Sequence, residues 1–267
     1  MFLRAVFIFS NFIMYNNYIL KKVIILNKKE GQTPLQALDG FRARNKKYQN
    51  IKMTYAGRLD PMASGVLLVL VDEECKKKDK YLTLSKEYEF SVLFGFATDT
   101  YDVLGFITRH NNLLRSQKSI TLSMLTNNIK KNLKFFRGKI WQKYPLYSSR
   151  TWARARAGEK VNALEREIEV KSFKLIKIRK ITPKKLLVNI EKRIQKIEGD
   201  FRQKKILKIW QQNLSRTTFD KFLIGDFKIK CSSGTYVRGI ANSLGKRIDI
   251  PALAFSIKRT KIGKWRV

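Results

Sequence analysis

The chain has 267 residues, of which 56 are Lys or Arg and 21 are Asp or Glu, so its formal net charge is +35. Apolar residues make up 44% of the chain, enough for the core of one large domain or two small ones. This excess of positive charge repels itself and favours a polyanionic partner, with nucleic acid as the first candidate. A generally Lys-rich composition is the plainer alternative.

Cysteine and histidine usage narrows the chemistry further. The two cysteines, Cys75 and Cys231, lie far apart in the sequence and form no ligand pattern. A disulfide framework or a zinc site is therefore not expected, and a reducing compartment fits. The single histidine, His110, lies in a polar stretch typical of a surface loop. Any catalysis is thus narrowed to carboxylate, Tyr, Lys or Ser chemistry.

The apolar segment 1–20 resembles a weak signal or anchor sequence, but three asparagines interrupt it. We therefore expect a disordered extension, or a start at Met14 in place of Met1, in preference to a membrane anchor. Residues 21–267 are expected to form the folded domain.

The folded domain opens with a strand pattern at 23–27. Thr33 can cap a following helix, and Pro34 suits the first helical position because its missing N–H has no partner there in any case. The apolar face of this helix would carry Leu35, Leu38 and Phe41.

A carboxylate, Asp60, stands directly before a proline in a Gly-rich turn. Because proline disfavours helix for the preceding residue, Asp60 is expected in an extended or turn conformation. The apolar run 66–71 follows at once and predicts a buried strand or helix segment. One acidic side chain is thus held on a stiff turn beside a core element. An ordinary Asp-Pro turn has the same pattern, so the pattern alone does not identify a catalytic residue.

Alternation of polar and apolar residues over 86–94 predicts a half-buried strand. Its buried face would carry Tyr88, Phe90, Val92 and Phe94. Strands dominate the centre of the chain with helices between them, which favours an α+β domain around a mainly antiparallel sheet. The remaining patterns predict a polar, Gly-bounded loop at 95–105, helices at 119–131 and 239–247, an aromatic and basic segment at 138–149, and strands at 169–180 and 227–231.

Segment 184–222 is unlike its surroundings because it is rich in lysine. It is predicted to be an inserted basic helical arm. Two interpretations stay open: the arm, with Trp210, extends a contact with RNA, or it is a solvated insertion. Its apolar residues recur at roughly helical spacing, at Ile194, Ile197, Phe201 and Trp210.

Several separated segments, taken in order, resemble the TruB-type tRNA pseudouridine synthases, which isomerise uridine 55 in the T-loop of tRNA. The block around Asp60 is similar to the catalytic motif of that family. The segments that carry the resemblance are 24–33, 57–67, 86–105, 145–148, 231–245 and 257–260.

The resemblance implies an α+β fold with a mixed, largely antiparallel sheet, flanking helices and an RNA-binding cleft. It also implies tRNA, through its T-arm and elbow, as the partner, a monomer in the cytoplasm, and no cofactor, metal or membrane. Many family members carry a C-terminal PUA domain, and this sequence is expected to have none.

The resemblance also implies roles for single residues. Asp60 would be the catalytic carboxylate, acting as nucleophile or base at the sugar or the uracil. Arg238 is expected to pair with Asp60 and orient it. Tyr88 would stack on the target uracil, and its hydroxyl would help to move the C5 proton. Tyr236 and Ile257 would line the pocket. The plainer alternatives are a phosphate contact for Arg238 and core packing for the tyrosines and the isoleucine.

The chain departs from the family pattern at positions that bear on substrate positioning more than on chemistry. Tyr55 stands where the family usually has His, Thr54 where it has Gly, and Thr151 where it has Lys. Tyr55 would stack in the space that the extruded uridine leaves.

The rival hypotheses are a noncatalytic tRNA-binding protein that helps the tRNA elbow to fold and a ribosome-associated basic protein. Asp60, Tyr88 and Arg238 together argue against the first, because binding alone does not require this set, and the second predicts salt-sensitive ribosome association without turnover on tRNA.

Overall fold

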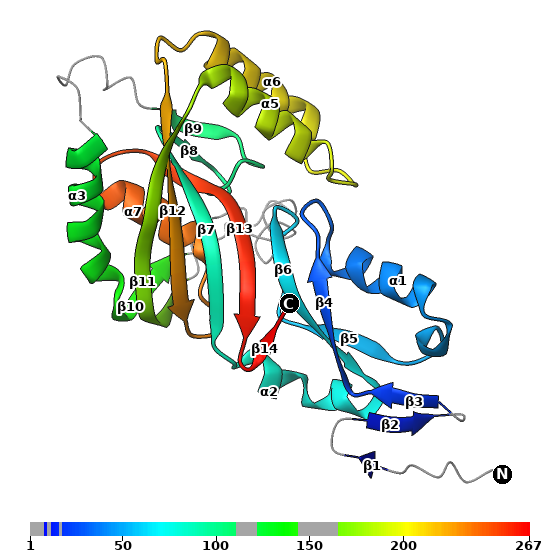
Figure 1. The fold of residues 1–267 in the computed structure, drawn as a ribbon. Coiled ribbons are helices and arrows are strands. Elements are labelled where there is room, and N and C mark those ends of the chain that lie inside the picture. The colour runs from blue at the N-terminus through cyan, green and yellow to red at the C-terminus, as the bar shows by residue number, and fades with distance from the viewer. Residues whose placement is uncertain (1–7, 10–11, 16–17, 111–121, 144–164) are drawn as a thin grey trace.

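The computed structural model describes residues 8–9, 12–15, 18–110, 122–143 and 165–267 (Figure 1). Its main sheet has nine strands. These are β4 (Val23–Lys28), β5 (Met53–Ala56), β6 (Ala63–Val71), β7 (Lys86–Phe94), β10 (Gly138–Lys143), β11 (Glu165–Ile181), β12 (Phe222–Cys231), β13 (Ala252–Ile262) and β14 (Trp265–Arg266). The α-helices are α1 (Pro34–Arg44), α2 (Lys78–Leu82), α3 (Leu122–Leu133), α5 (Pro183–Ile194), α6 (Gln203–Ser215) and α7 (Val237–Arg247).

The main sheet is mixed and largely antiparallel. Its strands follow the order β10-β11-β12-β7-β13-β6-β4, with β14 beside β13 and β5 beside β6. Only the β13–β6 pairing is parallel among the described strands, and it joins Ile257–Arg259 to Ala63–Gly65. β5 continues along the same edge of β6, because β4 occupies the opposite edge. The α+β expectation is confirmed, and the sheet is two antiparallel halves joined at one short parallel seam.

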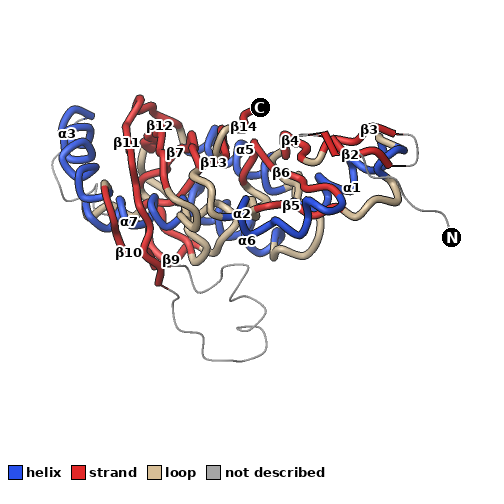
Figure 2. Tube along the Cα trace, turned by 90° about the horizontal axis from the view of Figure 1, so that it is seen from below, coloured by secondary structure: helices blue, strands red, loops and turns tan. Residues whose placement is uncertain are grey.

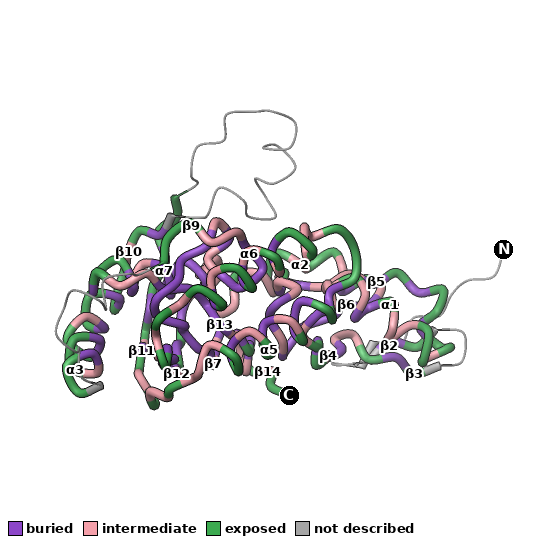
Figure 3. Tube along the Cα trace, turned by 90° about the horizontal axis from the view of Figure 1, so that it is seen from above, coloured by how far each residue is buried: buried purple, intermediate pink, exposed green. Residues whose placement is uncertain are grey.

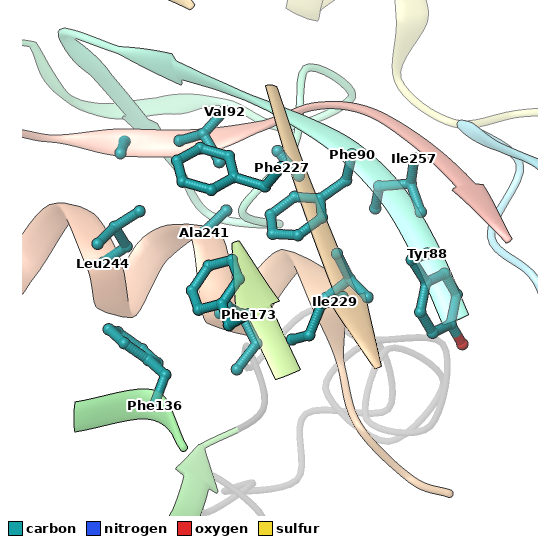
Figure 4. Close-up of a cluster of buried hydrophobic side chains, with 14 of the residues drawn as sticks. Tyr88, Phe90, Val92, Phe136, Phe173, Phe227, Ile229, Ala241, Leu244 and Ile257 are labelled. Atoms are coloured by element: carbon teal, nitrogen blue, oxygen red, sulfur yellow. The ribbon is translucent and has the colours of Figure 1, made fainter. Parts of the chain in front are cut away.

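One face of the sheet carries the larger core. α3 and α7 pack there, and the Phe90 ring stacks with those of Phe173 and Phe227 at centroid distances of 5.8 and 5.5 Å, while Phe173 and Phe227 are tilted against each other at 5.4 Å (Figure 4). Aromatic rings at these distances and offsets attract one another beyond the burial of their area. This core fixes α7, and with it the residues at the start of that helix, against the centre of the sheet.

The opposite face carries a second core, formed with α5 and α6. Leu93 of β7 lies in it, while its strand neighbours Val92 and Phe94 lie in the first core. Alternate residues of a strand point to opposite faces, so β7 is covered on both sides over this stretch. The half-buried strand expected at 86–94 is therefore wrong for its second half. The α5–α6 pair covers the face that was expected to meet solvent.

The arm residues fold into α5 and α6, and β12 begins at Phe222, the last residue of the predicted arm. Trp210 is fully buried in the second core. Of the two interpretations left open for the arm, the one in which Trp210 extends an RNA contact is wrong for this side chain, because its ring is buried between the arm and the sheet.

Loop 95–105 is also more buried than its composition suggested. It contains β8 (Phe96–Thr98), which pairs with β9 (Ile107–His110), and its Val103 is completely buried. Asp102 is only 3% exposed. The polar side chains of this loop therefore point inward, which matters for the site below.

The N-terminal residues that the structure describes form short strands where a disordered extension was one expectation. β1 (Ile8–Phe9), β2 (Phe12–Tyr15) and β3 (Tyr18–Lys21) make an antiparallel three-stranded sheet. Leu20 packs into a small core with α1 and β5. Within the described ranges, no helix is long and apolar enough to cross a membrane.

The predicted cap of α1 is confirmed, whereas the predicted buried face of that helix is only partly correct. Thr33 caps α1 in a full capping box with Gln36, as expected for the cap. The predicted helix face is wrong at Leu35, which is 55% exposed in the first turn, while Ala37 and Leu38 are buried. α3 occupies part of the predicted 119–131 segment, and 119–121 lie outside the described residues.

Seen from below and from above, the molecule is elongated, with α3 near one end and β2–β3 at the other (Figures 2 and 3). The buried positions gather along its middle, and exposed positions follow its outer faces (Figure 3). The seam between β13 and β6 lies within this middle region.

Candidate active site

A pocket of about 570 Å³ opens at the seam between β13 and β6. The Asp60 turn, the start of β7, the segment before α7 and the middle of β13 form its walls. The predicted site residues on its lining are Tyr55, Asp60, Tyr88, Tyr236 and Ile257. Among the described residues, the pocket thus gathers these side chains from four separate parts of the chain.

Asp60 lies on a tight turn between β5 and β6. Its carbonyl accepts a hydrogen bond from the N–H of Ala63 at 2.9 Å, and Gly57 starts the turn with a φ of +85°. Glycine adopts this left-handed conformation without the steric cost that other residues incur. The Asp60 side chain is 28% exposed, so the carboxylate is held by the turn and still reaches the pocket.

The ion pair predicted between Asp60 and Arg238 is present. Arg238 lies in the first turn of α7 and donates from Nε to Asp60 Oδ2 at 3.0 Å. Its guanidinium also lies 4.6 Å from the centroid of the Tyr236 ring. Arg238 itself does not line the pocket but stands behind Asp60, which it orients.

Asp102 completes this network, and the sequence analysis missed it. Its Oδ2 lies 2.9 Å from Arg238 Nη1, which also donates to the Thr100 carbonyl at 2.8 Å. The hydroxyl of Thr100 and the N–H of Leu104 donate to Asp102 Oδ1. A buried carboxylate needs such partners. The available signal was the spacing of short polar residues in 98–102, within the segment that was predicted only as a polar, Gly-bounded loop.

Burial and the neighbouring charges shift the pKa values of both Arg238 and Asp102. Burial by itself would lower the pKa of Arg238, but Asp60 foremost, with Tyr236 and Asp102, raises it above its usual range. Burial raises the pKa of Asp102, against the opposing effects of Arg238 and the Thr100 hydroxyl. The guanidinium therefore stays charged throughout the range in which proteins function.

Arg259 holds the Asp60 turn from the other side of the seam. It is 2% exposed, and its guanidinium donates to the carbonyls of Val66 at 2.8 Å and Arg58 at 3.1 Å. A third contact reaches the carbonyl of Gly57 at 3.4 Å. A residue of β13 thus fixes the backbone just before Asp60. The segment 257–260 carried the family resemblance, but only Ile257 was predicted to belong to the site.

Tyr88 and Ile257 form the apolar wall of the pocket, and Figure 4 shows both at one end of the larger core. Tyr88 is 8% exposed and Ile257 is 7% exposed. Burial raises the pKa of Tyr88, and the nearby Arg259 guanidinium offsets only part of the effect. The Tyr88 phenol is therefore protonated at neutral pH.

Tyr236 is held by a side chain that the sequence analysis did not select. Gln142 of β10 accepts a hydrogen bond from the Tyr236 N–H at 2.8 Å and donates to the Tyr236 carbonyl at 2.6 Å. Gln142 is 3% exposed, so these bonds form away from bulk water. The two bonds fix the residue that precedes α7 and contributes to the pocket wall.

The rim of the pocket is cationic. Asp60 is its only carboxylate among the lining residues that the structure describes. Tyr55 lies on β5 with Lys78 Nζ at 5.8 Å from its ring centroid. Burial lowers the pKa of Lys86 to about 8, and its ammonium donates to the Leu82 and Leu84 carbonyls. The basic lining residues are Arg58, Lys78, Lys86, Arg166 and Arg259.

Some of the predicted positions lie outside the described residues. These are the 145–148 segment and Thr151. In the described ranges, no cluster of three or more His, Cys, Asp or Glu side chains could hold a metal ion.

Comparison with known proteins identifies the family. Residues 44–199 match the family model described as TruB family pseudouridylate synthase, N-terminal domain. The chain belongs to this family. A relative from Borreliella burgdorferi, tRNA pseudouridine synthase B, is 30% identical over 246 residues, which cover 91% of the chain and 70% of the relative. The protein of that name from Endomicrobium trichonymphae is 30% identical, with 93% and 86% covered.

The fold of this TruB-family chain is also found among solved structures. A chain of the Cbf5–Nop10–Gar1 complex superposes with a TM-score of 0.52 at 20% identity. The match covers 91% of this chain and 49% of the other, so the TruB-family chain spans about half the length of that protein. At this level of identity the likeness concerns the fold alone.

Proposed function

We propose that the chain isomerises uridine 55 in the T-loop of tRNA to pseudouridine, with Asp60 as the catalytic carboxylate. The observation that carries this proposal is the buried pair of Arg238 and Asp102 behind Asp60, whose carboxylate is the only one among the described lining residues of a cationic pocket. Membership of the pseudouridylate synthase family and the names of its relatives support the same reaction.

The reaction is an isomerisation and balances without an external reactant. The C1′–N1 bond of uridine breaks, the detached base turns, and a C1′–C5 bond forms. The proton on C5 is lost, and N1 gains one. A carboxylate serves this chemistry because it can attack carbon or stabilise positive charge that develops at C1′. Arg238 orients the Asp60 oxygen atoms for that role.

The pocket walls suit a uracil extruded from its stack. Extrusion costs about a few kcal/mol, which stacking on an aromatic side chain partly offsets. Tyr88 supplies such a ring, and its protonated phenol suits hydrogen-bond donation rather than removal of the C5 proton. The less buried basic lining residues, Arg58, Lys78 and Arg166, provide charge for the RNA backbone. Tyr55 on the rim would brace the space that the uridine leaves.

The first test is to incubate the protein with an unmodified tRNA transcript and map pseudouridine chemically. The parent is expected to form pseudouridine at position 55, and Asp60→Asn to form none, because the amide neither attacks carbon nor carries the negative charge. The tRNA dissociation constant should change by less than about threefold, since phosphate contacts dominate affinity.

Glu73→Gln is the matched control, because Glu73 is an exposed carboxylate paired with Lys76 on the surface. It should keep full turnover. Tight tRNA binding without product from the parent would contradict the proposal and favour the noncatalytic tRNA-binding alternative. Product at another uridine would retain the chemistry and overturn the assigned position.

A further inference from the structure

The α5–α6 arm packs against the catalytic sheet rather than projecting from it. Its inner faces form the second core, and Figure 1 shows the two helices side by side next to β8 and β9. Both helices contact segments that lead to the Asp60–Arg238 pair. The contacts form two routes, one from each helix.

The first route starts on α6. The indole N–H of Trp210 donates to the Val103 carbonyl at 3.1 Å. Arg202, at the start of α6, donates to Asp99 Oδ2 at 3.2 Å, and its guanidinium lies 4.1 Å from the centroid of the Phe106 ring. The arm therefore holds the 98–106 loop at both its middle and its ends.

Hydrogen bonds within the 98–106 loop connect these arm contacts to Arg238. Asp99 Oδ1 accepts a bond from the Phe106 N–H at 2.8 Å, and the Thr98 hydroxyl donates to the Asp102 carbonyl at 2.6 Å. These bonds place the Asp102 carboxylate, which contacts Arg238 at 2.9 Å. Because Arg238 is buried, its orientation follows that of the loop.

The second route starts on α5. Arg193 donates two hydrogen bonds to the Glu30 carboxylate, at 3.0 and 2.8 Å, and one to the Phe255 carbonyl. Gly31, which follows Glu30 in the chain, lies so close to Lys196 that a Cβ added to Gly31 would stand 2.7 Å from the Lys196 backbone. The Gly31 N–H donates to the Pro61 carbonyl at 2.9 Å, beside Asp60.

We propose that the α5–α6 arm is an internal brace that positions Asp60 and Arg238 relative to each other. Trp210, Arg202 and Arg193 are positioning residues in this proposal, which rests on the proposed function for its kinetic test. The routes reach the pair from opposite sides, one through the 98–106 loop and one through the turn at 29–33. Charge on the outer face of the arm is not needed for this role.

The test compares Trp210→Phe and Arg202→Gln with the parent in single-turnover assays at saturating tRNA. Phe keeps most of the buried volume but lacks the N–H that binds the Val103 carbonyl. Each variant is expected to lower the rate constant about tenfold and leave the tRNA dissociation constant within about twofold. Lys208→Gln, an exposed position of α6, is the matched control and should leave both constants unchanged.

If the arm instead contacts tRNA, the dissociation constant should change and the rate constant should not. Lys208→Gln and Arg202→Gln would then weaken binding with an unchanged rate at saturation, and the brace would be overturned. A double-mutant cycle with Asp102→Asn separates positioning from general loss of stability. If Trp210 and Arg202 act through Asp102, their effects on the rate will not add to that of Asp102→Asn, whereas independent effects add. Additive effects would count against the proposal.

Hydrogen exchange of the free protein supplies a readout that needs no turnover. Trp210→Phe should speed exchange of the amides in 98–106 by about tenfold, with exchange in β10 and α3 unchanged. If Trp210→Phe speeds this exchange but the parent makes no pseudouridine, the proposed function is overturned and the brace stands. If the parent makes pseudouridine but Trp210→Phe leaves this exchange unchanged, the brace is overturned and the proposed function stands.

Discussion

At the scale of single residues, the site depends on side chains that hold backbone as well as on those that face substrate. Arg259 binds the carbonyls of Arg58 and Val66, on either side of Asp60 in the chain, and Gln142 binds both backbone groups of Tyr236. A buried backbone group that loses its partner costs about 1–3 kcal/mol, so these two residues constrain the pocket strongly.

We predict that Gln142→Met slows single turnover about tenfold, equal to about 1.4 kcal/mol at the transition state. Met keeps the length of the side chain but cannot bond the Tyr236 N–H and carbonyl, so the pocket wall loses its fixed position. Quenched-flow measurement with saturating tRNA checks this. Gln212→Met, at an exposed position of α6, is the control and should match the parent. Equal rates for both variants would show that the Gln142 bonds do not position the wall.

The residue scale also shows where sequence reasoning works. Asp60 stood out because a lone carboxylate before proline sits in a segment that resembles a family motif, and its contact with Arg238 followed from the same resemblance. Asp102 did not stand out, because short polar residues in a loop look alike whether they stabilise a turn or bind a buried cation. Arg259 was missed because its targets are backbone carbonyls, which leave no pattern in a sequence.

At the scale of elements, the parallel seam depends on Gly65. Its φ is +106°, and an added Cβ would stand 2.1 Å from the Arg259 carbonyl oxygen. Gly65 pairs with Arg259 on one side and with Lys28 on the other, so neither neighbour can move without disturbing the sheet. The absent side chain therefore allows β13 to approach β6 beside the pocket.

We predict that Gly65→Ala lowers the free energy of unfolding by about 3 kcal/mol or more, because strain and overlap add. Gly138→Ala is the control: its φ is +79°, but no atom lies within 4 Å of its added Cβ. That variant should lose only about 1–2 kcal/mol, from the conformation alone. Urea unfolding of the two variants measures the difference. Similar losses would mean that the close approach at the seam relaxes easily.

Elements were predicted well where their determinants are local. The capped start of α1 and the alternation of β11 and β12 are set by neighbours in the sequence. The two-sided burial of β7 and the inward face of the arm were not predicted, because they depend on α5 and α6 folding back over the sheet. The lysines of the arm lie on its outer face, so its lysine-rich composition did not indicate that its inner face packs into the second core.

At the scale of the whole molecule, some of the many lysines, including Lys28 and Lys86, are buried in the interior. Lys28 is completely buried and donates to the carbonyls of Lys29 and Gln32. Burial lowers its pKa to about 8, although Asp60 opposes the effect. The pKa of Lys86 is lowered to about 8 by burial, with a smaller contribution from Arg259. Two protonated lysines in the folded state therefore oppose stability at neutral pH.

The sign of the resulting pH dependence follows from proton binding. Above about pH 8 the folded state releases these protons, whereas the unfolded state keeps them up to about 10.5. Unfolding then takes up protons, so the free energy of unfolding rises with pH by about 1.4 kcal/mol per pH unit for each lysine. Lys28→Met should remove one lysine's share of this slope.

Urea titrations between pH 7.5 and 9.5 check the prediction, since tyrosines ionise above this range. Lys204→Met, at an exposed position of α6, is the control for the loss of one positive charge. It should keep the slope of the parent. Parallel lines for the parent and Lys28→Met would contradict the prediction.

The position of β13 also has a consequence for how the protein is made on the ribosome. β13 spans Ala252–Ile262 and follows both β6 and β7 by more than a hundred residues in the chain, yet it lies between them in the sheet. Asp60 leaves the ribosome 178 residues before Arg238, and the strand that joins their two halves follows later still. Until then, the β13-pairing stretch of β6 stays open to other strands and to chaperones. Activity is therefore expected only after β13 has left the ribosome, and translation products that stop before Ala252 should carry no partial activity.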